Sequence, residues 1–182
     1  MSKKKGKGAA QSGQGPWWTN GPVTLYHGTC QESAQDIIDH GVNMARAVPR
    51  SQAFTDFGPG FYTTEDRMQA DEWASKHFKG RAAIVKIVVQ REELAKLACL
   101  AFESDTVSFW NLIRHHRMEG KPDHCRLLGN KMYDMVVGPV ADSWGAKIGV
   151  CDVCGRYGQV SFHTERAEAM LLKADRDWER LK

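Results

Sequence analysis

Apolar and polar residues alternate along several short segments, as they do in strands with one buried face. Residues 23–27 (VTLYH) show this alternation, and Gly28 is expected to end the strand. Residues 82–89 (AAIVKIVV) form a nearly continuous Val/Ile run, which is typical of a central strand covered on both faces. Further extended segments are predicted at 61–62, at 97–102, at 133–140, where Gly138-Pro139 should end the strand, and at 158–164.

Apolar residues that recur every three or four positions predict helices between these strands. Thr29 and Glu32 form an S/T-x-x-E capping box at the start of the first helix, and Gly41 suits its C-terminal cap. Thr64 is expected to cap a second helix and Thr164 a final one. A further helix is predicted over 105–118 and a short helical turn at 91–96. The positions expected to face the core are, for the first helix, Ala34, Ile37 and Ile38; for the second, Ala70, Trp73, Ala74 and His77; for the helix over 105–118, Phe109, Trp110, Ile113 and Arg117; and for the final helix, Ala167, Met170, Leu171, Ala174, Trp178 and Leu181.

Strands and helices are mixed in this order but do not alternate strictly. The pattern therefore favours an α+β fold with a curved or split sheet over a doubly wound parallel one. With 182 residues, the chain is expected to form one domain over 21–182, preceded by a flexible tail over 1–20. The sequence contains neither G-x-G-x-x-G after a strand nor G-x-x-x-x-G-K-[ST], so the common phosphate-binding loops are missing.

The charge is concentrated at the N-terminus. The net charge is +3, and without the four lysines at positions 3, 4, 5 and 7 it would be 3 − 4 = −1. A basic tail on a near-neutral body can hold loosely to nucleic acid or to an anionic membrane surface. The alternative, a disordered solubilising terminus, is the interpretation we favour.

The sequence gives no sign of a membrane or export address. No stretch approaches the roughly 20 apolar residues of a membrane span, and the N-terminus lacks the apolar core of a signal peptide. Five cysteines, an odd number, suggest reduced thiols in a cytosol. We therefore expect a cytoplasmic protein without a membrane partner, and delivery by a signal-less secretion route stays open.

Polar and aromatic groups gather where predicted strands meet loops, from which a rigid sheet can present them to a cleft. These segments are Tyr26-His27-Gly28, Phe61-Tyr62-Thr63-Thr64 after the glycine-rich DFGPG loop, and Gln159-Val160-Ser161. Taken singly, His27 is more often a turn-capping histidine and Tyr62 a packing residue. The glycines of the loop permit close backbone approach, either in a tight bend or beside a flat ligand.

Four segments carry a more specific signal: LYHGT, DFGPGFYTT, YDMVVGPVAD and QVSFHTERA. Together, over about residues 23–172, they resemble a little-characterised, mainly bacterial family of the ADP-ribosyltransferase superfamily, on the side of diphtheria toxin and poly(ADP-ribose) polymerase. The resemblance implies a split antiparallel β-sheet core with flanking helices. It also implies that NAD is the substrate.

The resemblance assigns roles to individual residues. His27 would bind the adenosine ribose of NAD, the backbone of Gly28 the carboxamide, and Tyr62 would stack on the nicotinamide. Gln159 stands where many such enzymes have a catalytic glutamate, although the resembling family commonly has glutamine there. An amide can bind a ribose hydroxyl but lacks the charge that offsets a developing cation. The implied catalytic residues are His27, Tyr62 and Gln159, the implied NAD-binding residues are Tyr26, His27, Gly28, Thr29, Phe61, Tyr62 and Thr63, and Glu103, Asp134 and Glu165 are candidates for the missing charge.

The expected function is toxin-like mono-ADP-ribosyl transfer from NAD to a macromolecule, with nicotinamide release. Such domains act in conflict between bacteria or in phage defence, and an antitoxin or immunity protein is a possible partner. The basic tail and the cluster around Arg114 and Arg117 favour nucleic acid, RNA above DNA, over protein as the acceptor. The main alternative is an inactive module that binds NAD, ADP-ribose or nucleic acid.

A zinc-stabilised nucleic-acid-binding protein is a third alternative. Cys151 and Cys154 form one C-x-x-C pair, and Cys125, His124 and His163 are the only further ligands proposed. A structural zinc usually needs four ligands, so no metal is the favoured expectation. His115 and His116, between Arg114 and Arg117, are predicted to form a polar solvated face or part of a basic target-binding surface.

Overall fold

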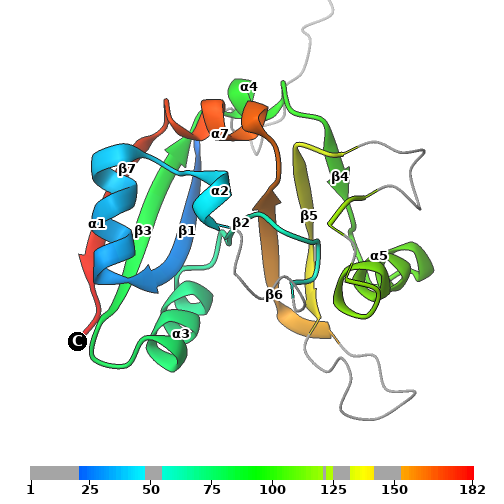
Figure 1. Ribbon diagram of the computed structural model, residues 1–182, viewed down its shortest axis with the longest axis horizontal. Helices are drawn as coiled ribbons and strands as arrows, with labels where there is room; N and C mark the ends of the chain where they lie inside the picture. Colours follow the sequence, from blue (N-terminus) through cyan, green and yellow to red (C-terminus); the bar gives the residue numbers. More distant parts are fainter. Residues whose placement is uncertain (1–20, 48–54, 121, 125–131, 142–152) are drawn as a thin grey trace, which may run out of the picture.

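A computed structural model describes residues 21–47, 55–120, 122–124, 132–141 and 153–182. Two sheets lie side by side, with helices around them (Figure 1), so the predicted α+β class is confirmed. The strands are β1 (Val23–Cys30), β2 (Phe61–Thr63), β3 (Ala82–Val89), β4 (Cys99–Ala101), β5 (Met135–Ala141), β6 (Val153–Phe162) and β7 (Asp175–Arg180). The helices are α1 (Gln31–His40), α2 (Met44–Ala47), α3 (Arg67–His77), α4 (Arg91–Leu94), α5 (Val107–Arg117) and α7 (Glu165–Leu171).

The first sheet has the order β1-β3-β7, and both of its strand pairs are antiparallel. β3 occupies the central position, as its Val/Ile content predicted, and Val85 and Ile87 are fully buried. Residues buried from both sides give a strand without polar alternation. The central strand therefore lies where the sequence placed it.

The second sheet has the order β2-β6-β5-β4. β6 is antiparallel to both β2 and β5, but β4 is parallel to β5, so this sheet is not wholly antiparallel as expected. A parallel pair needs a long crossover between its strands, and the segment that carries α5 provides it.

A backbone bridge joins the two sheets. Tyr26 of β1 and Thr64, which follows β2, exchange two backbone hydrogen bonds of 2.7 and 2.9 Å. β2 thereby lies between β1 and β6, as Figure 1 shows. The three segments that the sequence singled out meet at this junction, because they lie on β1, β2 and β6.

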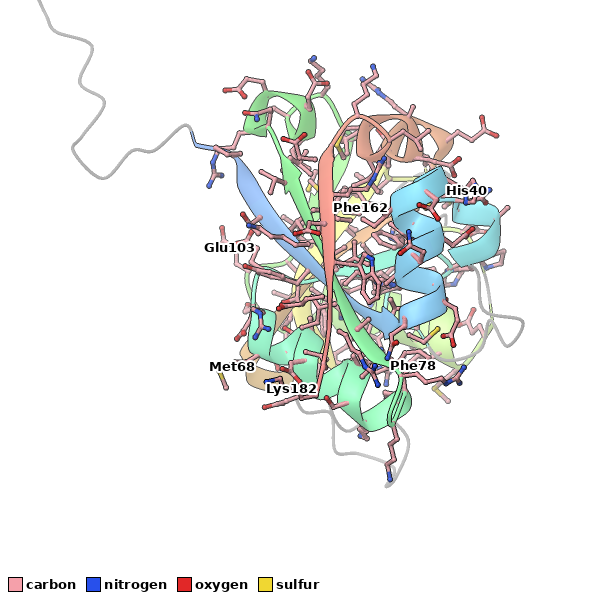
Figure 2. The ribbon with its side chains drawn as sticks, turned by 90° about the vertical axis from the view of Figure 1, so that its left-hand side faces the viewer. His40, Met68, Phe78, Glu103, Phe162 and Lys182 are labelled. Atoms are coloured by element: carbon pink, nitrogen blue, oxygen red, sulfur yellow. The ribbon has the colours of Figure 1, made fainter. Side chains whose placement is uncertain are left out.

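Two apolar clusters hold the layers together. The larger one combines side chains from both sheets with those of α7, and Phe162, fully buried, belongs to it. Figure 2 places Phe162 toward the middle of the molecule and Met68 and His40 at its edge. The smaller cluster packs α5 against the second sheet: Phe57, Phe109, Leu112, Ile113, Val136 and Ala141.

The start of α1 differs from the prediction. β1 continues through Gly28 and Thr29 to Cys30, which pairs with Ala82, so Gly28 does not end the strand. The N-terminal cap is Cys30, which forms no capping side-chain bond, and Thr29 is buried in the strand. The capping-box interpretation was wrong because pairing with β3 takes up the backbone of Thr29. Gly41 does cap the end of the helix, at φ 85°.

The inner face of α3 is narrower than predicted. Asp66, not Thr64, caps the helix by accepting hydrogen bonds from the backbone of Met68 and Gln69. Of the predicted inner positions Ala70 and Ala74 are buried, whereas Trp73 and His77 are exposed and stack at 4.0 Å. Because Ala70 and Ala74 have small side chains, α3 packs close to β1, and a larger side chain would not fit between the helix and the strand.

The final helix ends earlier than predicted. Thr164 caps α7 by accepting a bond from the Ala167 N–H at 3.3 Å, as expected. The helix stops at Leu171, and the segment that carries Trp178 forms β7 along the free side of β3. The helical spacing of Ala174, Trp178 and Leu181 was misleading, because hydrogen bonds to the edge of the sheet outweighed the local preference for a helix.

β5 also runs past Gly138-Pro139, with an irregularity between Pro139 and Val140, so these residues do not end it. β6 begins well before the predicted segment, at Val153. The remaining predictions at 91–96, 97–102 and 105–118 correspond to α4, β4 and α5. Within the described residues, no helix has the length and apolar character needed to cross a membrane.

Replacing Phe162 with alanine is expected to lower the free energy of unfolding by about 3–5 kcal/mol, because it leaves a large cavity between the sheets. Denaturant titration measures this change. The control is Val107→Ala, since Val107 is 77% exposed at the start of α5 and should shift stability by at most about 0.5 kcal/mol. Equal effects of the two variants would contradict the assignment of the core.

Candidate functional site

His27 and Tyr62 are tied together at the junction of the two sheets. The Nδ1–H of His27 donates to the backbone carbonyl of Tyr62 at 2.7 Å. Because a carbonyl only accepts, the proton is on Nδ1, and the neutral ring presents Nε2 as an acceptor. Burial lowers the pKa of His27, which keeps the ring neutral, and the ring packs on Phe61 at 4.4 Å. The two residues that resemble an NAD-binding pair are therefore neighbours in space.

The glycine-rich loop before β2 is buried and tightly packed. Gly58 has φ +83°, and a Cβ there would lie 2.7 Å from the ring of His116. A Cβ on Gly60 would lie 2.5 Å from the Phe162 carbonyl oxygen. Both positions therefore require glycine. The predicted close approach is real, and in this structure the approaching groups are protein atoms.

The hydroxyl of Tyr62 belongs to the same loop. It accepts from the Phe57 N–H at 2.9 Å and donates to the Gly58 carbonyl at 2.7 Å, while Thr55 Oγ1 donates to the same carbonyl at 2.8 Å. Burial raises the pKa of Tyr62, so the phenol stays protonated. Tyr62 is therefore fixed by its hydroxyl, and its ring is positioned as one unit with the loop.

Two histidines hold the other carbonyls of the loop. The Nε2–H of His124 donates to the Phe57 carbonyl at 3.0 Å, and the Nδ1–H of His163 donates to the Pro59 carbonyl at 2.8 Å. The second nitrogen of His124 accepts from the Tyr133 N–H at 3.1 Å. Nε2 of His163 lies 2.8 Å from the Ser161 hydroxyl, which also lies 3.2 Å from the Val136 carbonyl; because burial lowers the pKa of His163, Nε2 accepts a hydrogen bond from the hydroxyl. Each ring thus uses one donor and one acceptor and is neutral.

The histidines form a continuous buried cluster beneath the loop. Ring centroids are 5.2 Å apart for His115 and His116, 5.4 Å for His116 and His124, and 4.6 Å for His124 and His163. Burial lowers the pKa of His124, and it lowers the pKa of His163 to about 3. His115 and His116 are buried, so the prediction of a solvated face was wrong for them. The surface of that helix retains Arg114, which is exposed.

Gln159 is buried beside a carboxylate. Its Nε2 donates to Asp56 Oδ2 at 2.5 Å and to the Pro139 carbonyl at 3.0 Å. Asp56 Oδ2 also accepts from the Ala141 N–H at 3.0 Å, and Oδ1 forms an ion pair with Arg117. Burial raises the pKa of Asp56, while Arg117 and the two N–H donors oppose this shift. Every contact is a donor, so the geometry fits the ionised carboxylate.

Asp56 and Arg117 contact the candidate site residue Gln159 directly or through each other, and sequence reasoning gave neither of them a place in the site. Asp56 opens the DFGPG motif, but only the glycines and aromatics of that motif were interpreted. Arg117 was correctly placed on the inner side of α5, yet it was also counted in a solvated basic face, which is wrong because its side chain is largely buried. The signal was a lone acidic residue before a glycine loop, and its partners lie far away along the chain.

Within the described residues, none of the three acidic candidates for the missing charge hydrogen-bonds to Gln159. Glu103 and Glu165 are exposed. Asp134 is buried but serves the fold, because it accepts from the Ala98 N–H at 2.8 Å and the Thr164 hydroxyl at 2.6 Å. The charge nearest to Gln159 is therefore that of Asp56.

The remaining predicted cofactor-binding residues have structural contacts. A Cβ on Gly28 would lie 2.4 Å from the Ala70 carbonyl oxygen, so this glycine lets α3 pack on β1. Tyr26 forms the bridge between the sheets, and Thr29 is buried in β1. Phe61 is buried in the larger cluster, and Thr63 donates to the Val160 carbonyl at 2.9 Å. No ligand contact is needed to explain the side chains of Thr29, Phe61 and Thr63 or that glycine, whereas the contacts of Tyr26 are those of its backbone.

The metal prediction falls largely on residues beyond those described. Cys125 and Cys151 lie outside them, and of Cys154 only the backbone, in β6, is described. Within the described part of the chain, no group of three or more His, Cys, Asp or Glu side chains could hold a metal ion. His124 and His163 each use one ring nitrogen in a bond to the loop and the other in a bond to Tyr133 or Ser161.

A family model matches the part of the chain that contains all of these site residues. Residues 23–173 match the model of a family described as "Protein of unknown function (DUF3990)". No curated protein matches the chain. The matched range includes the loop, the histidine cluster and the Asp56–Gln159 pair, so the function has to be argued from their geometry.

The histidine cluster predicts a loss of stability in acid. The pKa of His163 is about 3 in the folded protein and 6.5 in the reference state, so between these values the unfolded chain binds the additional proton. Its contribution is complete above pH 6.5 and is lost as the pH falls toward 3. For this group alone, the free energy of unfolding should be about 2 kcal/mol lower at pH 5 than at pH 7.

Denaturant titrations over this pH range test the prediction with a matched pair of variants. His163→Gln should flatten the profile in part, because the pKa values of His27 and His124 are lowered too. His40→Gln changes an exposed histidine on α1 and should follow the wild type. A His163→Gln profile identical to that of the wild type would show that His163 does not contribute.

Proposed function

The chain belongs to the DUF3990 family, and we propose that it is an NAD-dependent mono-ADP-ribosyltransferase. The observation that carries the proposal is the hydrogen bond between His27 and the backbone of Tyr62. It joins two of the three residues to which the superfamily resemblance gives a catalytic role. The third, Gln159, lies on β6, which pairs directly with the strand of Tyr62.

The arrangement of strands supports the same proposal. Tyr62 pairs with Ser161, so the two side chains project from one face of the sheet, and Gln159 projects from that face two residues earlier. His27 approaches from the other sheet across the Tyr26–Thr64 bridge. A junction between two sheets, with polar groups from both, is the kind of split-sheet site that the resemblance implies.

The proposed chemistry breaks the bond between the nicotinamide nitrogen and the ribose carbon. The bonding electrons neutralise the pyridinium as nicotinamide leaves, and positive charge develops on the ribose. The nucleophilic atom of a macromolecule then bonds to that carbon and loses its proton to solvent. His27 would bind a hydroxyl of the adenosine ribose through Nε2, and Tyr62 would stack on the nicotinamide. Gln159 would accept a hydrogen bond from the ribose that carries the nicotinamide.

The proposed acceptor of ADP-ribose is a macromolecule. Nucleic acid is favoured over protein, and RNA over DNA. Arg114 is exposed on α5 and is available to phosphates, whereas Arg117 is paired with Asp56. The basic lysines at positions 3–7 lie outside the described residues. Action as a toxin, opposed by an antitoxin or immunity protein, fits such a modification.

A module that binds NAD without turnover is the second candidate. The observation that favours it is the amide at position 159, because an amide carries no charge to offset the developing cation. Both candidates predict NAD binding, and only the transferase predicts nicotinamide release.

The test compares Tyr62→Ala with Tyr62→Phe. Tyr62→Phe keeps the ring and loses only the bonds to Phe57 and Gly58, so it controls for loosening of the loop. We expect Tyr62→Ala to weaken NAD binding about 2- to 30-fold relative to Tyr62→Phe, the range of a stacked cation.

Nicotinamide release and transfer of labelled ADP-ribose are measured for both variants and the wild type, with RNA, DNA and cell protein offered separately. Label on one pool, lost in Tyr62→Ala, identifies the acceptor class. Release without any label indicates hydrolysis of NAD. Binding without release supports the second candidate, and absence of NAD binding refutes both.

A further inference from the structure

We infer that Asp56 is a positioning residue for Gln159, fixing its amide so that the side chain offers a substrate its carbonyl oxygen and never its NH₂ group. This inference rests on the proposed function, because it concerns what Gln159 does in that reaction. It also assigns a role to the first residue of the DFGPGFYTT motif, which the resemblance left without one.

The contacts of Gln159 define one orientation of its amide. Both hydrogen bonds that the described residues give it use Nε2, one to the Asp56 carboxylate and one to the Pro139 carbonyl. Each partner is an acceptor without a proton. Turning the amide over would place Oε1 against both of them, and a buried group that loses its partners in this way is strongly disfavoured. Within the described part of the chain no hydrogen bond engages Oε1, so this is the atom that can meet a ligand.

Asp56 is itself held from three directions. The Ala141 N–H and Gln159 share Oδ2, and Arg117 pairs with Oδ1. Arg117 reaches it from α5 and donates in addition to the Ala141 carbonyl at 3.3 Å. The carboxylate is thus anchored to β5, β6 and α5 at once, and it cannot rotate away from Gln159 without breaking several bonds.

Orientation, and not charge, is the effect that the geometry supports. Asp56 stands behind the amide and brings a negative charge near the site, but the positive charge of Arg117 touches the same carboxylate. The guanidinium therefore offsets part of the field of the carboxylate at the site. The choice of oxygen over NH₂, by contrast, changes the sign of the group that the ligand meets.

The variant Asp56→Asn tests this directly. The single oxygen of the asparagine is expected to stay on Arg117, because an unpaired buried cation is the more costly alternative, so its NH₂ group faces Gln159. Gln159 then accepts from that NH₂ group by turning over, at the cost of its bond to Pro139, and presents NH₂ to the ligand. We expect kcat for nicotinamide release to fall by about tenfold to 100-fold, as one misdirected hydrogen bond at a reacting centre does. The Kd for NAD should change by less than about threefold, because Tyr62 and His27 are untouched.

The exchange variant Asp56→Asn/Gln159→Glu separates positioning from a structural role. In it the asparagine NH₂ can donate to the glutamate at 159, which again offers an oxygen to the ligand. The single variant Gln159→Glu instead puts two carboxylates in contact, so that one must take up a proton. We expect the exchange to regain at least about tenfold in kcat over Asp56→Asn, without regaining its thermal midpoint.

Asp134→Asn is the matched control. Asp134 is also a buried carboxylate that accepts bonds from a hydroxyl and a backbone N–H and pairs with an arginine, but its partners are Thr164, Ala98 and, at 3.8 Å, Arg166. The Asp134→Asn variant should have a lower thermal midpoint than the wild type. Its kcat, measured at a temperature well below unfolding, should stay within about threefold of the wild-type value.

The outcomes distinguish this inference from the proposed function. Absence of nicotinamide release by the wild type overturns the function and, with it, the inference. If the wild type releases nicotinamide, then an unchanged kcat in Asp56→Asn overturns the inference alone. The inference is also overturned if the kcat of the exchange variant stays low, as its thermal midpoint does, because Asp56 would then act only through stability.

Discussion

The structure depends on satisfying three successive carbonyl groups of one buried loop. Phe57 and Gly58 are buried, Pro59 is partly buried, and none of the three lies in a strand or helix. Buried carbonyl groups outside regular structure need other donors. A side chain supplies one at each position: His124 for Phe57, Tyr62 and Thr55 for Gly58, and His163 for Pro59.

This constraint explains why the histidines are neutral and buried. A histidine that must donate from one nitrogen and accept at the other is satisfied only as the neutral ring. The cluster thereby joins the loop to the end of β6 through Ser161 and to the start of β5 through Tyr133. The ring of Tyr62, and through its carbonyl the ring of His27, inherit their positions from the same set of bonds.

The parts of this arrangement that follow from local pattern were predictable, and the parts that depend on distant partners were not. The strand of His27, the glycine loop and the aromatic Tyr62 were each marked by residues that follow one another in sequence. The partners of Asp56 are Arg117, Ala141 and Gln159, which local spacing cannot connect. The segment of Trp178 looked helical by itself and became a strand because β3 offered an edge.

The glutamine at position 159 fits its surroundings better than a glutamate would. A carboxylate there would lie in contact with Asp56, and two buried carboxylates in contact cannot both be ionised without a further cation. Arg117 is already paired with Asp56, and among the described residues it is the one cation in contact with that carboxylate. An amide resolves the conflict by donating where a second carboxylate would repel. Gln159 is therefore the complement of Asp56, and its departure from the glutamate of many enzymes in the superfamily that the sequence resembles is not in itself a sign of a decayed site.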